Sequence, residues 1–364
     1  MHIIRVFVAA LAVMAAPGAM AEGDNGLVGL ERIIAAWLAS PHGDYHSPSF
    51  TYWNEGGEVP ESCAMCHSET GFLDFLGADG SEAGSVHRPG AINSPIGCAS
   101  CHTAEAHALD AVTFPVGMEV DGFGMNATCN VCHAGRQSGD AVASRVEDMD
   151  ADAVSSDLSF INIHYGPAAA VTLGADVRPG VQYDGRSYAG RFMHVPGAAT
   201  CSDCHSPHST RLSQAVVEGC VACHQGGAED LREIRTQHRD FAGTGDRSGG
   251  IHAEIVALEA KLFDAIRLYA AEVAGTPIAY GAGFPYFFVD QDGSGEATGE
   301  HLSRDNRYQA FTPRLLKAVY NYQVSRKSPG GYVHNPRYML QILHDSLVDL
   351  AEAVEIDVSG VSRP

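Results

Sequence analysis

Hydrophobic and polar positions follow different patterns in the two halves of the chain. After residue 225, apolar residues recur at spacings of three and four, which predicts α-helices with one buried face. Two of these helices begin with a capping residue followed by Pro, and the other is bounded by Gly. The predicted helices lie between Gly250 and Gly275, from Thr312 to near Ser328, and from Asn335 through Leu350.

The rest of the chain shows shorter patterns. Apolar residues between Leu27 and Leu38 predict one more helix, which leads to His42. Residues 42–224 are rich in Gly, Ser, Pro and Asp and contain few long periodic runs. Residues 225–250 and 280–311 are predicted to be loops, with the aromatic segment Phe284–Phe288 buried.

The N-terminus has the pattern of a secretory signal. An apolar run from Val6 to Ala16 follows Arg5 and precedes the small residues Ala19 and Ala21. A membrane span needs roughly 20 apolar residues, so a retained anchor is the alternative that this short run disfavours. We therefore expect residues 1–21 to be removed and the product to be periplasmic or extracellular. No later window is apolar enough to predict a transmembrane span.

All ten cysteines fall into five copies of one pentapeptide, Cys-x-x-Cys-His. This is the attachment pattern of c-type haem, in which two thiols bond the porphyrin and the histidine binds its iron. Zinc ribbons and disulfides are the alternatives, but neither requires a histidine after every second cysteine. The five copies are Cys63/Cys66/His67, Cys98/Cys101/His102, Cys129/Cys132/His133, Cys201/Cys204/His205 and Cys220/Cys223/His224.

These motifs predict the organisation of the chain. After the signal peptide, residues 22–225 form a region that binds five haems, and residues 226–364 form a haem-free helical region packed on it. The expected fold is mainly α, a loop-rich multihaem cytochrome c core covered by a C-terminal bundle of long helices. The porphyrins would supply the buried apolar surface that the motif region lacks.

The second axial ligand decides what each iron can do. An iron with histidine on both faces transfers electrons, whereas an open face can bind a substrate. Of 18 histidines, five belong to the motifs and His2 to the signal, so 12 remain as candidates. His208 is too close to His205 to share its iron and is placed to serve a neighbouring haem. The preferred distal ligands are His42, His164, His194, His208 and His334, with His87 and His107 as substitutes.

Charge limits the partners of the protein. With 23 basic and 44 acidic side chains the formal net charge is -21, which excludes nucleic acid as a partner. The acidic surface favours a basic or polar redox partner. Asp290 and Asp292 open a turn like the first half of an EF-hand loop, but position 12 is His301 instead of Glu. An acidic turn is therefore preferred there, and calcium is retained as a candidate ligand.

Several segments carry a family resemblance. The run from His194 through Cys201 to His205-Ser-Pro, followed by a haem-free helical tail with His334, resembles the superfamily of cytochrome c nitrite reductase and hydroxylamine oxidoreductase. The chain also resembles a group of exported pentahaem cytochromes. The segments that carry this second resemblance are Tyr52–Glu55, Gly71–Gly77, Cys132–Arg136, Asn162–Tyr165 and Tyr320–Gln323.

The resemblance implies a mainly helical fold with haems in near-parallel and near-perpendicular pairs. It also implies bis-histidine ligation for most of the haems, with the five preferred distal histidines in that role. The chain departs from the enzymes of the superfamily in two respects. Nitrite reductases typically carry a lysine in place of one motif histidine, whereas all five motifs here end in His. Hydroxylamine oxidoreductases use a crosslinking tyrosine, and no tyrosine of this sequence can be assigned that role.

The sequence therefore predicts an exported pentahaem cytochrome that moves electrons, and no residue is assigned a catalytic role. The alternative is a reductase or oxidase that acts on a small nitrogen or sulfur compound at one five-coordinate haem. Arg136 is the only obvious cation near a motif that could attract an anion there. A subunit of a polymeric cytochrome wire is a third interpretation.

Overall fold

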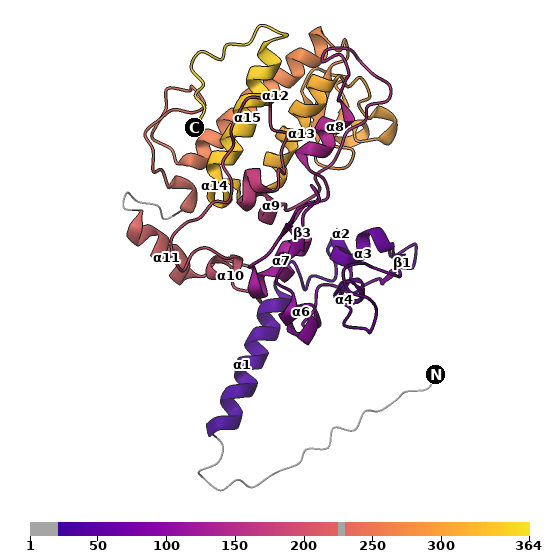
Figure 1. The fold of residues 1–364 in the computed structure, drawn as a ribbon, viewed down its shortest axis with the longest axis vertical. Coiled ribbons are helices and arrows are strands. Elements are labelled where there is room, and N and C mark those ends of the chain that lie inside the picture. Colours follow the sequence, from indigo (N-terminus) through magenta and orange to yellow (C-terminus); the bar gives the residue numbers. More distant parts are fainter. Residues whose placement is uncertain (1–20, 225–229) are drawn as a thin grey trace.

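The computed structural model describes residues 21–224 and 230–364. The predicted signal peptide, apart from Ala21, therefore lies outside the described residues. Figure 1 shows the short helices of the motif region below a bundle of long C-terminal helices, with α1 (Ala21–Leu38) projecting from the body. Within the described residues, no helix combines the length and the apolar character needed to cross a membrane.

Short helices and turns dominate the motif region. The helices before residue 225 are α1 (Ala21–Leu38), α2 (Pro48–Thr51), α3 (Glu61–His67), α4 (Glu69–Leu76), α5 (Ala99–His102), α6 (Ala104–Ala108), α7 (Ala127–Cys132), α8 (Gly139–Arg145), α9 (Ala168–Leu173), α10 (Cys201–Cys204) and α11 (Gln214–Cys223). Two antiparallel pairs accompany them: β1 (Glu58–Val59) with β2 (Gly90–Ala91), and β3 (Val112–Thr113) with β4 (Glu119–Val120). Short 3-10 turns cover Gly124–Asn126 and Gly174–Asp176.

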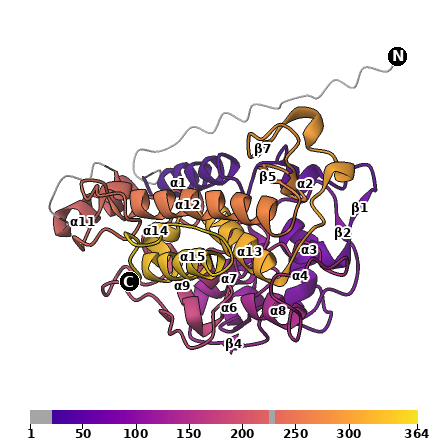
Figure 2. The ribbon, with the colours of Figure 1, turned by 90° about the horizontal axis from the view of Figure 1, so that it is seen from above.

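The C-terminal region contains longer elements. Its helices are α12 (Ile251–Glu272), α13 (Pro313–Lys327), α14 (Gly331–His334) and α15 (Pro336–Ala351). Its strands are β5 (Ile278–Gly281), β6 (Phe287–Val289) and β7 (Glu296–Ala297), and short 3-10 turns cover Leu231–Glu233, Gly299–His301 and Arg304–Asn306. Helices α12, α13 and α15 pack against one another, and Figure 2 shows α12 lying alongside α15.

The three C-terminal helices predicted from the sequence are confirmed. The Thr312 hydroxyl accepts a hydrogen bond from the backbone N–H of Leu315 at 3.1 Å and caps α13. The Asn335 side chain accepts one from the N–H of Tyr338 at 3.1 Å and caps α15. Each cap satisfies a backbone donor that the first helical turn leaves unpaired, and the following Pro has no such donor to lose.

The loop predicted for residues 280–311 is partly wrong, because this segment contributes to a three-stranded sheet in the order β6-β5-β7. Tyr280 lies opposite Phe287 in the antiparallel pair, with ring centroids 5.2 Å apart. Strands of two to four residues are too short to show a period of two, and cross-strand aromatic packing stabilises them instead. Phe284, predicted to be buried, is 59% exposed at the turn, whereas Tyr286, Phe287 and Phe288 are buried.

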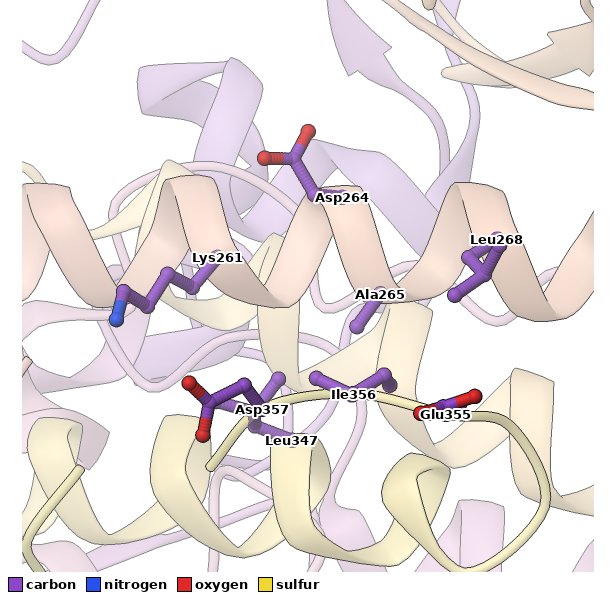
Figure 3. Close-up of a pocket in the computed structure, with 8 residues that line it drawn as sticks. All are labelled: Lys261, Asp264, Ala265, Leu268, Leu347, Glu355, Ile356 and Asp357. Carbon is purple, nitrogen blue, oxygen red and sulfur yellow. The ribbon is translucent and has the colours of Figure 1, made fainter. Parts of the chain in front are cut away.

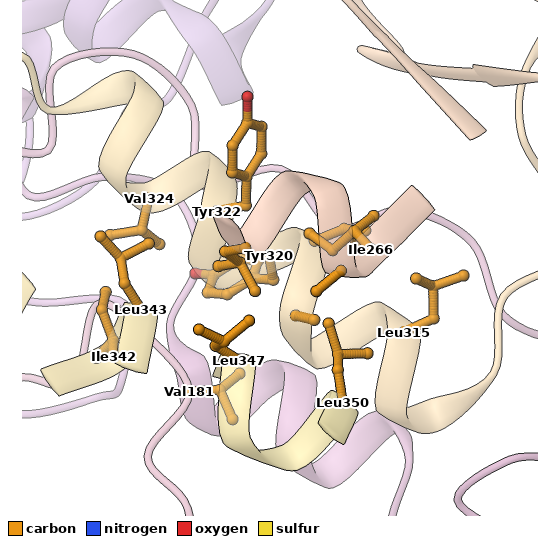
Figure 4. Packing of buried hydrophobic residues seen from close by; sticks show 14 of the residues in the cluster. Val181, Ile266, Leu315, Tyr320, Tyr322, Val324, Ile342, Leu343, Leu347 and Leu350 are labelled. Carbon is orange, nitrogen blue, oxygen red and sulfur yellow. The ribbon is translucent and has the colours of Figure 1, made fainter. Parts of the chain in front are cut away.

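The largest hydrophobic core lies within the C-terminal bundle and extends into the motif region. Figure 4 shows Ile266, Leu315 and Leu347 packed around Tyr320. Residues between Val142 and Val181 contribute to the same core. The buried Asn321 side chain reinforces this contact, because its amide oxygen accepts from the N–H of Val181 at 2.7 Å and its NH2 donates to the Val181 carbonyl at 3.0 Å. The bundle and the second half of the motif region therefore share one core.

Candidate haem-binding sites

All five Cys-x-x-Cys-His motifs lie on short helical turns. They occupy α3, α5, α7, α10 and the C-terminal end of α11, and the motif residues just outside these helices are the cap residues Cys98, His133, His205 and His224. Because side chains three and four positions apart share one face of a helix, each turn presents its two thiols and its histidine on the same side. The ten cysteines are free thiols, as attachment to a porphyrin requires. Within the described residues, no group of three or more His, Cys or acidic side chains could hold a bare metal ion.

Three motif histidines are oriented by backbone carbonyls. The Nδ1 atom of His67 lies 2.9 Å from the carbonyl oxygen of Ser49, that of His133 lies 2.8 Å from that of Gly166, and that of His205 lies 2.8 Å from that of Thr210. A carbonyl oxygen only accepts hydrogen bonds, so Nδ1 must carry the proton. The Nε2 lone pair is then free for a metal, which is the usual arrangement around ligating histidines.

Four of the five motif histidines face a second imidazole. Two metal–nitrogen bonds of about 2 Å each would place the Nε2 atoms of two axial histidines about 4 Å apart and their ring centres about 6 Å apart. The Nε2 atoms of His67 and His164 are 3.5 Å apart. The ring centroids are 5.8 Å apart for His67 and His164, 6.4 Å for His133 and His42, 5.8 Å for His224 and His194, 6.3 Å for His102 and His208, and 6.2 Å for His102 and His107.

His334 lies near His205 of the fourth motif, the remaining motif histidine. Burial, then the neighbouring rings of His205 and His133, lowers the pKa of His334 to about 4. Its Nδ1 atom is buried and has no hydrogen-bond partner among the described residues, which is costly for a polar group. A side chain at Gly330 would place its Cβ only 2.6 Å from Cε1 of the His334 ring, so the absence of a side chain makes room for this imidazole.

Each preferred distal histidine lies near a motif histidine. Most of the other non-motif histidines do not. The Nδ1 atom of His87 is 3.0 Å from Oδ1 of the buried Asp74, and no close ring pairs it with a motif histidine among the described residues. His252 packs on Tyr332, and His344 is hydrogen-bonded to Asp345. His107 is the exception, since it faces the same motif histidine as His208.

The third motif lies next to the first and the fourth. The Cys132 Sγ atom is 3.9 Å from the Met65 carbonyl oxygen, and a hydrogen bond with the Cys66 thiol together with burial raises the pKa of Cys132. On the other side, the backbone N–H of Ser202 donates to the side-chain oxygen of Asn126 at 3.0 Å. The Cys201 Sγ atom lies 3.7 Å from a side-chain oxygen in the third motif, that of Asn130.

The second and fifth motifs lie at the two sides of this group. Burial and then the nearby Cys129 thiol raise the pKa of Cys101, which places the second motif beside the third. Burial and then the Cys220 thiol raise the pKa of Cys204, which places the fourth motif beside the fifth. The motifs therefore form a contiguous group in which the third motif has the most neighbours.

One pocket lies at the first pair of histidines. It has a volume of about 320 Å³ and is lined by His164, Arg136, Gln137, Asn162 and apolar side chains. Burial, followed by the charges of His67, Arg136 and Lys327, lowers the pKa of His164 to about 4. Figure 3 shows a second pocket between α12 and the C-terminal segment, lined by Lys261, Asp357 and their neighbours, and it contains no predicted site residue.

The acidic turn at Asp290 is held by groups of the chain itself. The Asp290 carboxylate accepts hydrogen bonds from the backbone N–H groups of Gly293 at 2.9 Å and Gly295 at 3.0 Å. The Arg267 guanidinium lies 3.5 Å from the same carboxylate. Asp292 accepts from the N–H of Ser294 at 2.9 Å. These contacts support the interpretation as an acidic turn, and the calcium prediction gains no support from them.

Sequence reasoning missed the backbone groups that orient the motif histidines. The carbonyls of Ser49, Gly166 and Thr210 could come from any residue type, so no sequence signal marks them. It also missed Lys327, which lies among aromatic rings near His164. The spacing of Lys327 within a predicted helix is compatible with an ordinary surface lysine.

No family model matches the chain, and no solved structure matches it. Curated proteins of Geobacter sulfurreducens match the chain. The C-type polyheme cytochrome OmcB is 25% identical over 364 residues, and the C-type polyheme cytochrome OmcC is 27% identical over 372 residues. The chain is similar to polyhaem c-type cytochromes. These matches cover 82% and 84% of this chain.

The similarity supports a multihaem c-type cytochrome with covalently bound haem, in agreement with the five motifs. The chain spans less than half the length of these relatives, because the matches cover 45% of OmcB and 44% of OmcC. The resemblance to nitrite reductases and hydroxylamine oxidoreductases finds no counterpart in these matches and stays a prediction.

Proposed function

We propose that the protein is an exported electron-transfer cytochrome that carries five covalent haems, most or all of them held between two histidines. The observation that carries this proposal is the spacing of the imidazole pairs, which fits one iron atom between each pair. The similarity to polyheme cytochromes supports it independently. Each haem, when bound, supplies a one-electron redox couple.

The proposed ligand pairs join distant parts of the chain. Helical turns provide the proximal histidines and loops provide most of the distal ones. For the second motif, His208 is preferred to His107, although both rings lie at a suitable distance from His102. The proposed pairs are His67 with His164, His102 with His208, His133 with His42, His205 with His334, and His224 with His194.

The chain prepares these sites in three ways. Backbone carbonyls fix the tautomer of three proximal histidines, so that Nε2 points to the metal position. The lack of a side chain at Gly330 leaves room for the His334 ring. Burial lowers the pKa of His42, His164 and His334, which keeps their rings neutral and able to bind a metal.

The contacts between motifs support an order for electron transfer. The first, third, fourth and fifth motifs follow one another in space, and the second lies beside the third. We infer a route from the first motif to the fifth through the third, with the second as a branch. Residues 22–225 would provide this route, and the helical region 226–364 would support it and supply His334.

The net charge of the chain indicates what kind of redox partner it would bind. A net charge of -21 favours a basic or polar redox partner and would accelerate its association at low ionic strength. The predicted signal peptide supports a periplasmic or extracellular location, where such a partner would be another protein or a terminal electron acceptor.

Mass spectrometry and spectroscopy of the purified holoprotein test the proposal. We expect the mass to exceed that of the polypeptide by five haems, and we expect the spectrum of the ferric protein to show only low-spin haem. His334→Ala should convert one haem of five to the high-spin state, whereas His344→Ala, which changes a histidine hydrogen-bonded to Asp345, should convert none. Fewer than five haems, or no difference between these two variants, would contradict the proposal.

A second candidate function is reduction or oxidation of a small nitrogen or sulfur compound at one haem. The polar pocket with Arg136 beside His164 favours this candidate, because it could hold a small anion near the first motif. A stoichiometric high-spin haem in the unmodified protein, with a spectrum that shifts on addition of nitrite or hydroxylamine, would support it over electron transfer.

A further inference from the structure

One short segment, residues 162–166, contacts two haem sites at once. His164 faces His67 across the first site, and two residues later the Gly166 carbonyl oxygen lies 2.8 Å from Nδ1 of His133 at the third site. A Cβ added at Gly166 would lie 3.2 Å from that same nitrogen. The position of this segment therefore affects the distal ligand of one haem and the proximal ligand of another.

The backbone of the segment is unusual at the ligand itself. His164 has a φ of 74°, in the left-handed region that residues other than Gly seldom adopt. Such a conformation persists only where surrounding contacts enforce it. One such contact is local, since the His164 backbone N–H donates to the Asn162 side-chain oxygen at 2.9 Å.

The other contacts come from Lys327, the last residue of α13. Its carbonyl oxygen accepts a hydrogen bond from the N–H of Gly166 at 3.2 Å. Its ammonium nitrogen lies 3.7 Å from the ring centroid of Tyr165 and 4.0 Å from that of Tyr286. Both distances are well inside the range of cation–π attraction. The Tyr165 hydroxyl also donates to the Ala282 carbonyl at 3.4 Å.

Lys327 is exceptional among the cations of this acidic chain. It is 7% exposed, and within the described residues no carboxylate lies within ion-pair distance of it. Burial lowers the pKa of Lys327. An ammonium group is seldom buried without a paired charge, so the two tyrosine rings supply the compensation. The last turn of α13 also favours a cation at this position, because the C-terminal end of the helix dipole is negative.

We propose that Lys327 is a positioning residue that clamps residues 162–166 and thereby holds His164 on the haem of the first motif. The inference rests on the proposed ligation of this haem by His67 and His164. Loss of the ammonium releases Tyr165, the segment relaxes from its left-handed conformation, and His164 leaves the iron in a fraction of the molecules. The clamp thus links the haem-free bundle to the ligand state of a haem.

The test compares Lys327→Met with Lys327→Arg and with Lys317→Met in the five-haem protein. Methionine keeps the length of the side chain and removes its charge, arginine keeps the charge, and Lys317 lies on the same helix without contact to Tyr165. The measured quantities are the high-spin fraction of the ferric protein and the amount of carbon monoxide bound by the reduced protein. Both report an open iron without any assay of activity.

For Lys327→Met we expect carbon monoxide binding to rise from near zero toward about one haem in five, with no such rise for Lys317→Met and little for Lys327→Arg. A folded Lys327→Met protein with all haems low-spin and no carbon monoxide binding would overturn the inference. If that variant does not fold, Tyr165→Leu provides the same comparison, because it removes one ring of the clamp and keeps Lys327. An open haem in the unmodified protein would instead contradict the five proposed histidine pairs, on which this inference rests.

Discussion

The C-terminal bundle and the motif region are stabilised in different ways. In the bundle, Leu262, Leu316 and Leu347 are fully buried, and the long helices pack on one another along their length. In the motif region, α10 and α11, which carry the fourth and fifth motifs, have no buried residue. Side chains also form a smaller buried cluster around the first three motifs, with Phe72 and Phe114 among its members. The contrast with the bundle is therefore sharpest at the fourth and fifth motifs.

This difference indicates where the free energy of folding comes from. Burial of apolar surface is the main favourable contribution, and short helices without buried faces contribute little of it. A porphyrin bonded to each turn would supply this missing surface. We therefore expect the bundle to fold from its own side chains, whereas the segment that carries the fourth and fifth motifs should depend on its cofactors.

The largest effect should appear in protein produced without haem attachment. Hydrogen exchange should remain slow in α12, α13 and α15 and become fast in α10, α11 and the loops around them, because only the bundle keeps its buried contacts. The holoprotein is the control. Equal protection of both regions in the haem-free chain would show that the comparison is wrong.

A substitution in the core of the bundle should have the next largest effect. Leu347 is fully buried, so Leu347→Ala should lower the free energy of unfolding by about 2–5 kcal/mol. Leu30 in the projecting helix α1 is 52% exposed, and Leu30→Ala should change it by less than about 0.5 kcal/mol. Denaturant unfolding followed by circular dichroism measures both, and similar losses for the two variants would contradict the assigned core.

Acid should reveal a polar contact that supports the motif region. The buried Asp74 carboxylate accepts hydrogen bonds from the backbone N–H groups of His87 and Arg88. The backbone hydrogen bond from His87, followed by the contact with the His87 side chain, lowers the pKa of Asp74 to about 2. The pKa of an aspartate in an unfolded chain is about 3.9, so the ionised Asp74 carboxylate stabilises the fold above that pH. The stabilisation is lost as the pH falls toward about 2.

The free energy of unfolding of Asp74→Asn should therefore fall less than that of the unmodified protein between about pH 4 and pH 2. Denaturant unfolding at several pH values measures this slope. The exposed Asp184→Asn variant is the control and should keep the slope of the unmodified protein. An unchanged slope in Asp74→Asn would mean that the buried carboxylate does not contribute through its charge.

The smallest effect is expected for calcium. Backbone N–H groups and Arg267 already contact the Asp290 carboxylate, so addition of millimolar calcium should leave the thermal midpoint unchanged. A midpoint that rises with calcium and falls again with a chelator would identify a binding site in the turn. Such a result would add a ligand-dependent element to a bundle that otherwise relies on packing.

The sequence predicts the bundle better than the motif region for a physical reason. Helical periodicity and the caps at Thr312 and Asn335 are local signals, and both helices begin where these residues indicate. The strands β5, β6 and β7 escaped prediction because they are too short to show alternation. Their stability comes from aromatic contacts with α13 and with each other, such as Tyr280 with Tyr322.

The candidate sites divide in the same way. The motifs can be read directly, because two cysteines and a histidine at fixed spacing lie on one helical turn. The candidate distal histidines are proposed from their neighbours in sequence, but which motif histidine each of them faces depends on the three-dimensional course of the loops. The pairing of His42 with His133 could not be deduced from spacing, nor could the contribution of the Gly166 carbonyl.

The position of His334 has a consequence for biogenesis. A polypeptide emerges in one direction and its earlier parts fold first, so the fourth motif is available for maturation long before α14 exists. Under the proposed ligation, the haem of the fourth motif would lack its second histidine until α14 has folded. A variant shortened before α14 should therefore still be coloured but should bind carbon monoxide at that haem.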